Sequence, residues 1–178
     1  MKNNTRKLTV IAVSAALSFL LQLIGSIIGL KVGGFLEIEL SEIPALICTF
    51  AYGPIAGIVV EFIKNLIHCT ITSTGFVGEL ANFSVNAVFA AVAGIIYKRN
   101  KTRKVALLSM LIAVLAMTAS AILTNLFIML PLYMASSPFS AKLSITLTLI
   151  TPFNLIRGFV VSLITFFIYK RLSPLIKG

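Results

Sequence analysis

Long runs of apolar residues, separated by short polar segments, divide the chain. A helix that crosses the hydrocarbon layer of a membrane takes about 20 residues. Four runs reach or approach that length, at residues 8–30, 80–97, 105–130 and 143–169. A fifth apolar stretch, residues 43–67, is interrupted by Tyr52-Gly53-Pro54, which is a strong turn signal. The pattern predicts four membrane-spanning helices and leaves the fifth stretch to be placed.

The basic residues lie at the ends of these runs. Eleven of the fifteen Lys and Arg residues fall within residues 2–7, 98–104 and 170–177. Short basic clusters stay on the cytoplasmic side, so both termini and the middle loop are expected inside. The chain must then cross an even number of times between residues 31 and 78. Two crossings, as a helical hairpin that turns near the inner face, suit residues 43–67 better than a re-entrant segment.

We therefore predict an all-α integral membrane protein, a six-transmembrane-helix bundle in a single domain, residues 1–178. Its N- and C-termini are cytoplasmic, and a long extracellular loop joins helices 1 and 2. Within that loop, Leu36-Glu37-Ile38-Glu39-Leu40 alternates apolar and polar residues, which suggests a short extended segment.

Composition excludes several classes of protein. With 58% hydrophobic and 11% charged residues, the chain does not read as a soluble domain. The net charge of +10 does not indicate nucleic-acid binding, because the cations lie at the ends of apolar runs, where anionic lipid headgroups account for them. The two cysteines, Cys48 and Cys69, are expected to be free thiols. We expect a protein of the lipid bilayer with no nucleic-acid partner.

No pattern typical of catalysis is present. The chain lacks Gly-x-x-x-x-Gly-Lys-Ser/Thr, Gly-x-Ser-x-Gly and His-Glu-x-x-His, and it has no cluster with metal-ligand spacing. Its one histidine, His68, is expected to be a packing or interface residue. We therefore predict that the chain is not an enzyme, that it hydrolyses no ATP and that it carries no cofactor.

Polar residues inside the predicted helices are the candidates for function, because they are costly in a membrane. Thr151, Asn154 and Arg157 are spaced by three and share a helix face, and Pro152 is expected to kink that helix. Asn125 lies near the outer end of the preceding helix. Amides and a guanidinium at one depth suit a ligand with hydroxyls and carbonyls. The alternative is interhelical hydrogen bonding, with Arg157 paired to Glu79 or Glu42.

Two further features have a simple and a functional interpretation. Glu61 and Lys64 lie one turn apart, which is typical of a helix-surface ion pair. Ala12 and Ala16 give the first helix a small-residue face, which serves either ordinary packing or docking of another membrane subunit.

Several segments, taken in order, carry a resemblance to a known family. They are Ala12-x-x-x-Ala16, Leu40-Ser41-Glu42-Ile43-Pro44-Ala45-Leu46, Tyr52-Gly53-Pro54-Ile55-Ala56-Gly57, Glu61-Phe62-Ile63-Lys64-Asn65-Leu66, Gly75-Phe76-Val77-Gly78-Glu79-Leu80-Ala81-Asn82-Phe83, Asn125, Pro131-Leu132-Tyr133 and Asn154-x-x-Arg157. Over essentially its whole length the chain resembles the riboflavin-binding subunits (S subunits) of energy-coupling factor (ECF) vitamin transporters, the RibU family. The segment around Glu79 is the most specific part.

The resemblance implies six helices and riboflavin captured near the outer face of the cell (plasma) membrane. It implies polar ligand contacts from Asn125, Asn154 and Arg157, where the family often has Lys in place of Arg157. Loop residues would bury the flavin ring and close the site. The expected ligand-binding set is Leu36, Ile38, Leu40, Glu42, Glu79, Asn125, Tyr133, Asn154 and Arg157. The resemblance also implies that Ala12 and Ala16 dock on a transmembrane coupling subunit, which works with two separate ATPase subunits.

Two alternatives stay open from the sequence. The chain could be a binding subunit of the same transporter class for another vitamin, with only the pocket changed. Less in keeping with the residues, it could be a stand-alone proton-coupled carrier with Glu61, Lys64 and Glu79 as the proton path.

Overall fold

The fold is an elongated bundle of helices, seen in a computed structural model that describes residues 2–28, 31–32, 36–37, 40–72 and 76–177. Within these residues, four helices are long and apolar enough to cross a membrane. They are Asn4–Ile28, Val77–Arg99, Arg103–Tyr133 and Phe139–Tyr169. These are the four helices that the apolar runs predict. The multi-pass membrane character of the chain is therefore confirmed.

The elements are as follows. The long helices are α1 (Lys2–Ile28), α4 (Val77–Arg99), α5 (Arg103–Thr124), which continues through η1 (Asn125–Met129) and α6 (Leu130–Tyr133), and α7 (Phe139–Ile145), which continues through η2 (Thr146–Ile150) into α8 (Thr151–Lys177). Two shorter helices, α2 (Glu42–Tyr52) and α3 (Pro54–His68), lie between α1 and α4. Two short strands, β1 (Lys31–Val32) and β2 (Leu36–Glu37), pair antiparallel ahead of α2.

The turn predicted at Tyr52-Gly53-Pro54, between two helices, is confirmed. Gly53 joins α2 to α3 with a φ of 95°, a left-handed value that favours glycine. A side chain at Gly57 would place its Cβ 1.8 Å from Thr49 Oγ1, so glycine is what lets α3 pack closely on α2. At 11 and 15 residues, these helices are about 16 and 22 Å long, shorter than the hydrocarbon layer.

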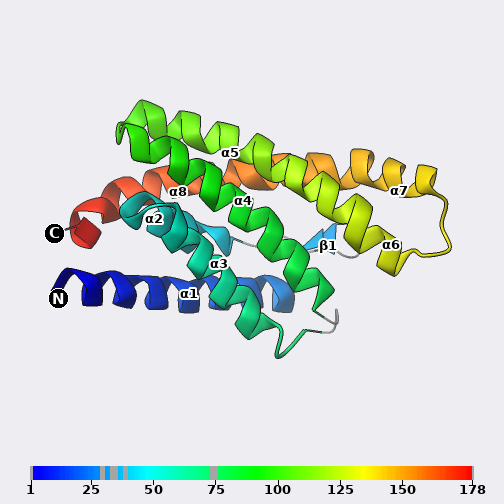
Figure 1. The fold of residues 1–178 in the computed structure, drawn as a ribbon, viewed down its shortest axis with the longest axis horizontal. Coiled ribbons are helices and arrows are strands. Elements are labelled where there is room, and N and C mark those ends of the chain that lie inside the picture. The colour runs from blue at the N-terminus through cyan, green and yellow to red at the C-terminus, as the bar shows by residue number, and fades with distance from the viewer. Residues whose placement is uncertain (1, 29–30, 33–35, 38–39, 73–75, 178) are drawn as a thin grey trace.

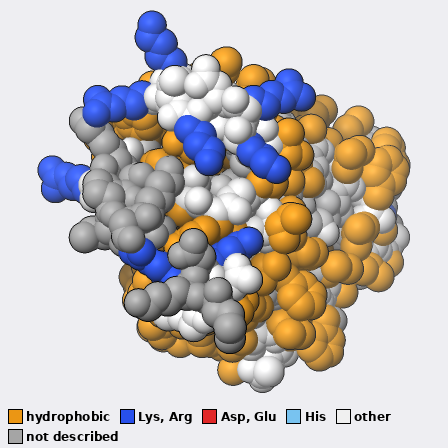
Figure 2. All heavy atoms as spheres, turned by 60° about the vertical axis from the view of Figure 1, so that its left-hand side comes forward, with side chains coloured by type: hydrophobic (Ala, Val, Ile, Leu, Met, Phe, Trp, Pro, Cys, Tyr) orange, Lys and Arg blue, Asp and Glu red, His pale blue; other side chains and the backbone are white. Residues whose placement is uncertain are grey.

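The basic segments lie together at one end of the bundle. Figure 1 places the start of α1, the α4–α5 connection and the end of α8 on its left-hand side, with the α6–α7 connection at the opposite end. Figure 2, which looks toward the left-hand side, shows Lys and Arg side chains gathered there. The interior near this end is aromatic: the ring of Phe50 lies 4.7 Å from that of Tyr97 and 5.3 Å from that of Tyr169. We call these three side chains the aromatic cluster, and the end that carries the basic segments the basic end.

Both long C-terminal helices contain one widened, π-helical turn. η1 ends just before Leu130-Pro131, and η2 ends just before Thr151-Pro152. Proline lacks an N–H and its ring clashes with the carbonyl four residues earlier, so the preceding turn cannot keep α-helical hydrogen bonding. At Pro152, where we predicted a kink, the helix therefore carries a π turn just ahead of the proline.

The loop between α1 and α2 is described in part. Leu36 and Glu37 are extended, as the alternation of apolar and polar residues predicts. Leu36 packs partly buried against the main core. Ile38 and Glu39 lie outside the described residues.

Candidate functional site

A buried cluster of polar side chains joins three helices, the start of α2 and the middle parts of α4 and of the continuous α7–α8 helix. Arg157 of α8 donates from Nη2 to Oε1 of Glu42, at the start of α2, and to Oδ1 of Asn86 on α4, at 3.0 Å. Asn86 donates from Nδ2 to the same Glu42 oxygen and to Oδ1 of Asn82, each at 3.0 Å. We call Glu42, Asn82, Asn86 and Arg157 the polar cluster. It brings a carboxylate, two amides and a guanidinium together inside an apolar bundle.

The polar cluster is secluded from solvent. Glu42 and Asn86 are each 1% exposed, and the side chain of Arg157 is 12% exposed. The ion pair makes burial of the guanidinium possible, since an unpaired charge in such an interior is strongly unfavourable. Oε2 of Glu42 is buried and accepts no hydrogen bond from any described residue. A ligand N–H or O–H could therefore bond to it.

Asn125 and Asn154 are both buried, and each lies in or next to one of the π turns that precede a proline. Asn125 begins η1, and its Nδ2 donates to the carbonyl of Ala121 at 2.8 Å. Asn154 follows η2, and its Nδ2 donates to the carbonyl of Ile150 at 2.9 Å. Because one donor of each amide is held by its own helix, the orientation of the amide oxygen is restricted. The sequence identified both residues, but their connection to the π turns comes from the structure.

Arg157 is paired with one of its two expected partners. The pairing is with Glu42, whereas Glu79 lies 2.9 Å from Nδ1 of His68. His68 also makes an edge-to-face contact with Phe19 of α1, so it is the interface residue that the sequence predicts. Glu79 therefore belongs to a contact between α3 and α4.

Glu61 and Lys64 form the expected ion pair, but the prediction that the pair lies on the surface is wrong. The two groups lie 2.6 Å apart, but the side chains are 1% and 0% exposed. Lys64 also donates to Oγ of Ser41 at 3.0 Å, which ties α3 to the start of α2. The spacing of three residues along the helix predicted the two partners correctly. It could not predict that their side chains are buried, because the burial comes from the packing of α3 between α1 and α4.

The remaining predicted residues lie at the rim or on the outside. Leu40 is 37% exposed, and Tyr133, at the end of α6, is 54% exposed. Ala12 and Ala16 are exposed on α1, whereas Ala15 between them is buried against α2 and α3. Ala12 and Ala16 therefore belong to the outer face of the bundle, not to the packing of α1 on its neighbours.

Asn86 is the central residue that the sequence interpretation missed. It lies one turn after Asn82, so the two amides share a helix face in the middle of an apolar span. That repeat of amides four residues apart was the available signal. Within the described chain, no group of three or more His, Cys, Asp or Glu residues could hold a metal ion.

A helical membrane bundle with a buried polar cluster in its interior suits the binding of a polar ligand within a membrane. Comparison with known proteins gives the family. Residues 6–169 match the family described as "ECF transporter, substrate-specific component". The chain therefore belongs to the substrate-specific components of ECF transporters, which are parts of transporters and not enzymes.

Individual relatives match the chain along nearly its full length. The chain is 34% identical over 182 residues to "Riboflavin transporter RibU" of Staphylococcus aureus, covering 99% of this chain and 95% of that protein. It is 32% identical over 181 residues to "Riboflavin transporter FmnP" of Bacillus subtilis, covering 97% and 94%. A solved structure described as "Structure and mechanism of the S component of a bacterial ECF transporter" superposes with a TM-score of 0.83 at 31% identity, covering all of both chains.

Proposed function

We propose that this chain is the riboflavin-binding subunit of an ATP-driven ECF transporter. The observation that carries the proposal is the 34% identity to a riboflavin transporter across 99% of the chain. The chain supplies the binding site, and separate subunits supply the energy. Its role is to capture the vitamin at the outer face of the cell membrane and to deliver it across with those subunits.

The chemistry of riboflavin suits the buried polar groups. The flavin ring has apolar faces, two carbonyls and an imide N–H, and the ribityl chain carries hydroxyls. In our proposal Arg157, Asn125 and Asn154 offer donors and acceptors to these groups, and Oε2 of Glu42 accepts from an N–H or O–H of the ligand. A few fixed polar groups in an apolar site set the orientation of a ligand whose ring supplies the buried area.

The rim residues complete the proposed site. Leu36, Ile38 and Leu40 belong to the loop before α2, and they would cover the ring. Tyr133 ends α6 at the same end of the bundle. Glu79 would act indirectly, because its carboxylate is held by His68. Closure of the loop over the ligand would exclude water and strengthen the polar contacts.

The first test is a riboflavin titration of the purified full-length protein, followed by quenching of flavin fluorescence. We expect saturable binding in the nanomolar range, which corresponds to about −12 kcal/mol. Asn125→Ala removes a buried hydrogen-bonding group and should weaken binding by about 10- to 100-fold. Asn100→Ala is the matched control, because Asn100 is exposed at the end of α4 that lies at the basic end.

Two results would contradict the proposal in different ways. A folded protein that ignores riboflavin but binds another vitamin would leave the transporter class intact and change the ligand. Equal affinities for the Asn125→Ala and Asn100→Ala variants would keep riboflavin as the ligand and remove Asn125 from the site.

We further propose six crossings with both termini in the cytoplasm, α2 and α3 forming the short pair. Positive charge at the basic end supports this orientation, because basic loops stay inside. α2 is shorter than the hydrocarbon layer, but all residues from Glu42 to Phe50 are covered by protein, so the short helix is surrounded by other helices and not by lipid.

The exposed face of Ala12 and Ala16 is the proposed docking surface for a transmembrane coupling subunit, which would act with two ATPase subunits. Small residues let a partner helix approach closely. Ala16→Leu should reduce co-purification of the coupling subunit several-fold and leave riboflavin affinity unchanged. Ala119→Leu, on the exposed face of α5, is the matched control. Co-purification that is equal for the two variants would move the docking surface elsewhere.

A further inference from the structure

Charge is separated along the bundle. All five cations within residues 98–104 are exposed, and so is Arg171 near the end of α8. All five acidic residues of the chain lie between residues 37 and 79. The exposed cations at the basic end, visible in Figure 2, therefore have no acidic residue on their own segments to neutralise them.

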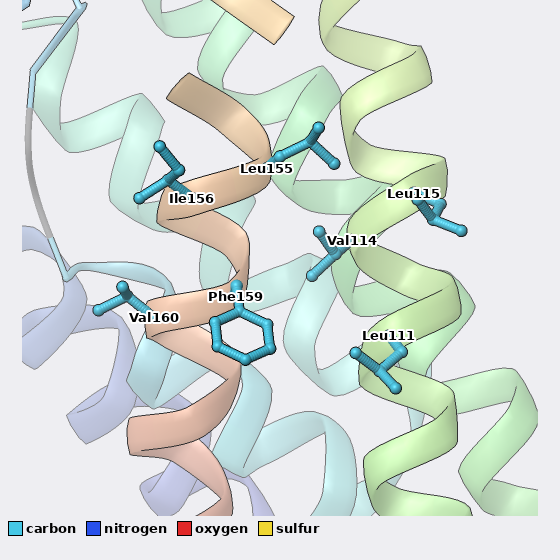
Figure 3. A pocket seen from close by; sticks show the side chains of 7 residues that line it. All are labelled: Leu111, Val114, Leu115, Leu155, Ile156, Phe159 and Val160. Carbon is cyan, nitrogen blue, oxygen red and sulfur yellow. The ribbon is translucent and has the colours of Figure 1, made fainter. Parts of the chain in front are cut away.

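An apolar groove lies on the outer surface between α5 and α8. It has a volume of about 450 Å³, and all seven of its lining residues are apolar. Figure 3 shows Leu111 and Leu115 on the α5 side and Phe159 and Val160 on the α8 side. These four side chains are between 42% and 64% exposed, so the groove opens outward, toward the membrane.

Lys104 lies on the groove face of α5, and Arg171 lies on the face of Val160, one of the α8 residues that line the groove. Residues 7 or 11 positions apart on an α-helix are about 20° apart around its axis. Lys104 precedes Leu111 by 7 positions and Leu115 by 11, and Arg171 follows Val160 by 11. Each helix therefore presents an apolar face that ends in an exposed cation.

The spacing matches half of a bilayer. At 1.5 Å per residue, Lys104 lies about 10 Å along α5 from Leu111, and Arg171 lies about 16 Å along α8 from Val160. One leaflet of the hydrocarbon layer is about 15 Å thick. A lipid whose headgroup lies at the level of the two cations would therefore place its acyl chain at the level of the groove.

We propose that α5 and α8 form a binding site for an anionic phospholipid of the leaflet at the basic end. Its headgroup lies at Lys104 and Arg171, and one acyl chain fills the groove. Charge complementarity selects this occupant, because a zwitterionic lipid would fill the groove without neutralising the cations. The site is separate from the polar cluster, and the proposal does not depend on which substrate is transported.

The test uses a fluorescent reporter in the groove face. The chain contains no Trp, so Leu108→Trp, between Lys104 and Leu111 on α5, gives a single emitter. The full-length protein is reconstituted in phosphatidylcholine and phosphatidylglycerol, with bromine on the acyl chains of one lipid at a time. Bromine quenches only the Trp that it contacts. Each cation near an anionic lipid contributes about fivefold in affinity, so we expect a preference for the anionic lipid of about 25-fold.

Charge-matched variants separate a defined site from general attraction. In the reporter protein, Lys104→Gln with Arg171→Gln should bring the preference close to one, whereas Lys98→Gln with Lys101→Gln should leave most of it. Circular dichroism checks that each variant keeps its helix content. Equal quenching by both lipids in the parent reporter would overturn the proposal. An equal loss in both pairs of variants would also overturn it, because it would show a diffuse surface potential.

Discussion

Arg157 is a permanently charged side chain in an apolar bundle, and its neighbours account for its presence there. Glu42 supplies the opposite charge, and Asn86 hydrogen-bonds to both members of the pair. Burying two charges costs several kcal/mol per ion, which their attraction and the added hydrogen bonds offset. At the scale of residues, stability therefore depends on the same atoms that we propose for ligand binding.

This dependence gives a prediction for stability. Glu42→Ala leaves the guanidinium buried without its counter-charge and should lower the free energy of unfolding by about 3–5 kcal/mol. Glu42→Ala with Arg157→Met removes both charges and should recover most of that loss. Denaturant unfolding of the detergent-solubilised protein, followed by circular dichroism, measures both variants. If the double variant is less stable than Glu42→Ala, the ion pair does not explain the burial of Arg157.

At the scale of elements, proline determines where two helices deviate from α-helical geometry. Pro131 and Pro152 each follow a π turn, and these turns hold or adjoin Asn125 and Asn154. A π turn adds one residue to a helical turn, so it rotates every later side chain about the helix axis. Both prolines therefore influence which side chains of α6 and α8 face the interior.

Replacing a proline should lower ligand affinity without lowering the stability of the fold. Pro131→Ala restores a backbone N–H and permits α-helical hydrogen bonds through residues 125–129. We expect thermal stability to be retained. Riboflavin affinity should fall by about tenfold or more, because the change of backbone geometry moves the side chain of Asn125. Pro138→Ala is the matched control, since Pro138 is exposed ahead of α7. Unchanged affinity in Pro131→Ala would mean that the π turn does not position the site.

At the scale of the whole molecule, the distribution of charge predicts which end faces the cytoplasm. With Cys48 and Cys69 both replaced by Ser, Lys101→Cys and Ser136→Cys place single thiols at opposite ends of the bundle. In intact cells, a membrane-impermeant maleimide should label Ser136→Cys and leave Lys101→Cys unlabelled until the cells are opened. Labelling of both positions from outside would contradict the orientation that the basic residues predict.

Much of this architecture could be predicted from the sequence, because apolar runs and turn residues act locally. The four long helices and the turn at Gly53 follow from composition within each segment. The pairing of Arg157 with Glu42 could only be narrowed to two partners, because it joins α8 to α2 across 115 positions. The burial of Lys64 was missed for the same reason, since it depends on which helices become neighbours. Asn86 was missed although the amides at Asn82 and Asn86, four residues apart, gave a local signal.

The aromatic cluster has a consequence for the energy balance of the membrane. The hydroxyl of Tyr169 donates to the carbonyl of Phe50 at 3.1 Å, and the rings of Phe50, Tyr97 and Tyr169 are all less than 10% exposed. The packed rings fill this part of the interior with largely apolar surface, and we expect it to hinder the passage of protons and ions through the bundle. A membrane that holds many copies of the protein would then keep its proton and ion gradients.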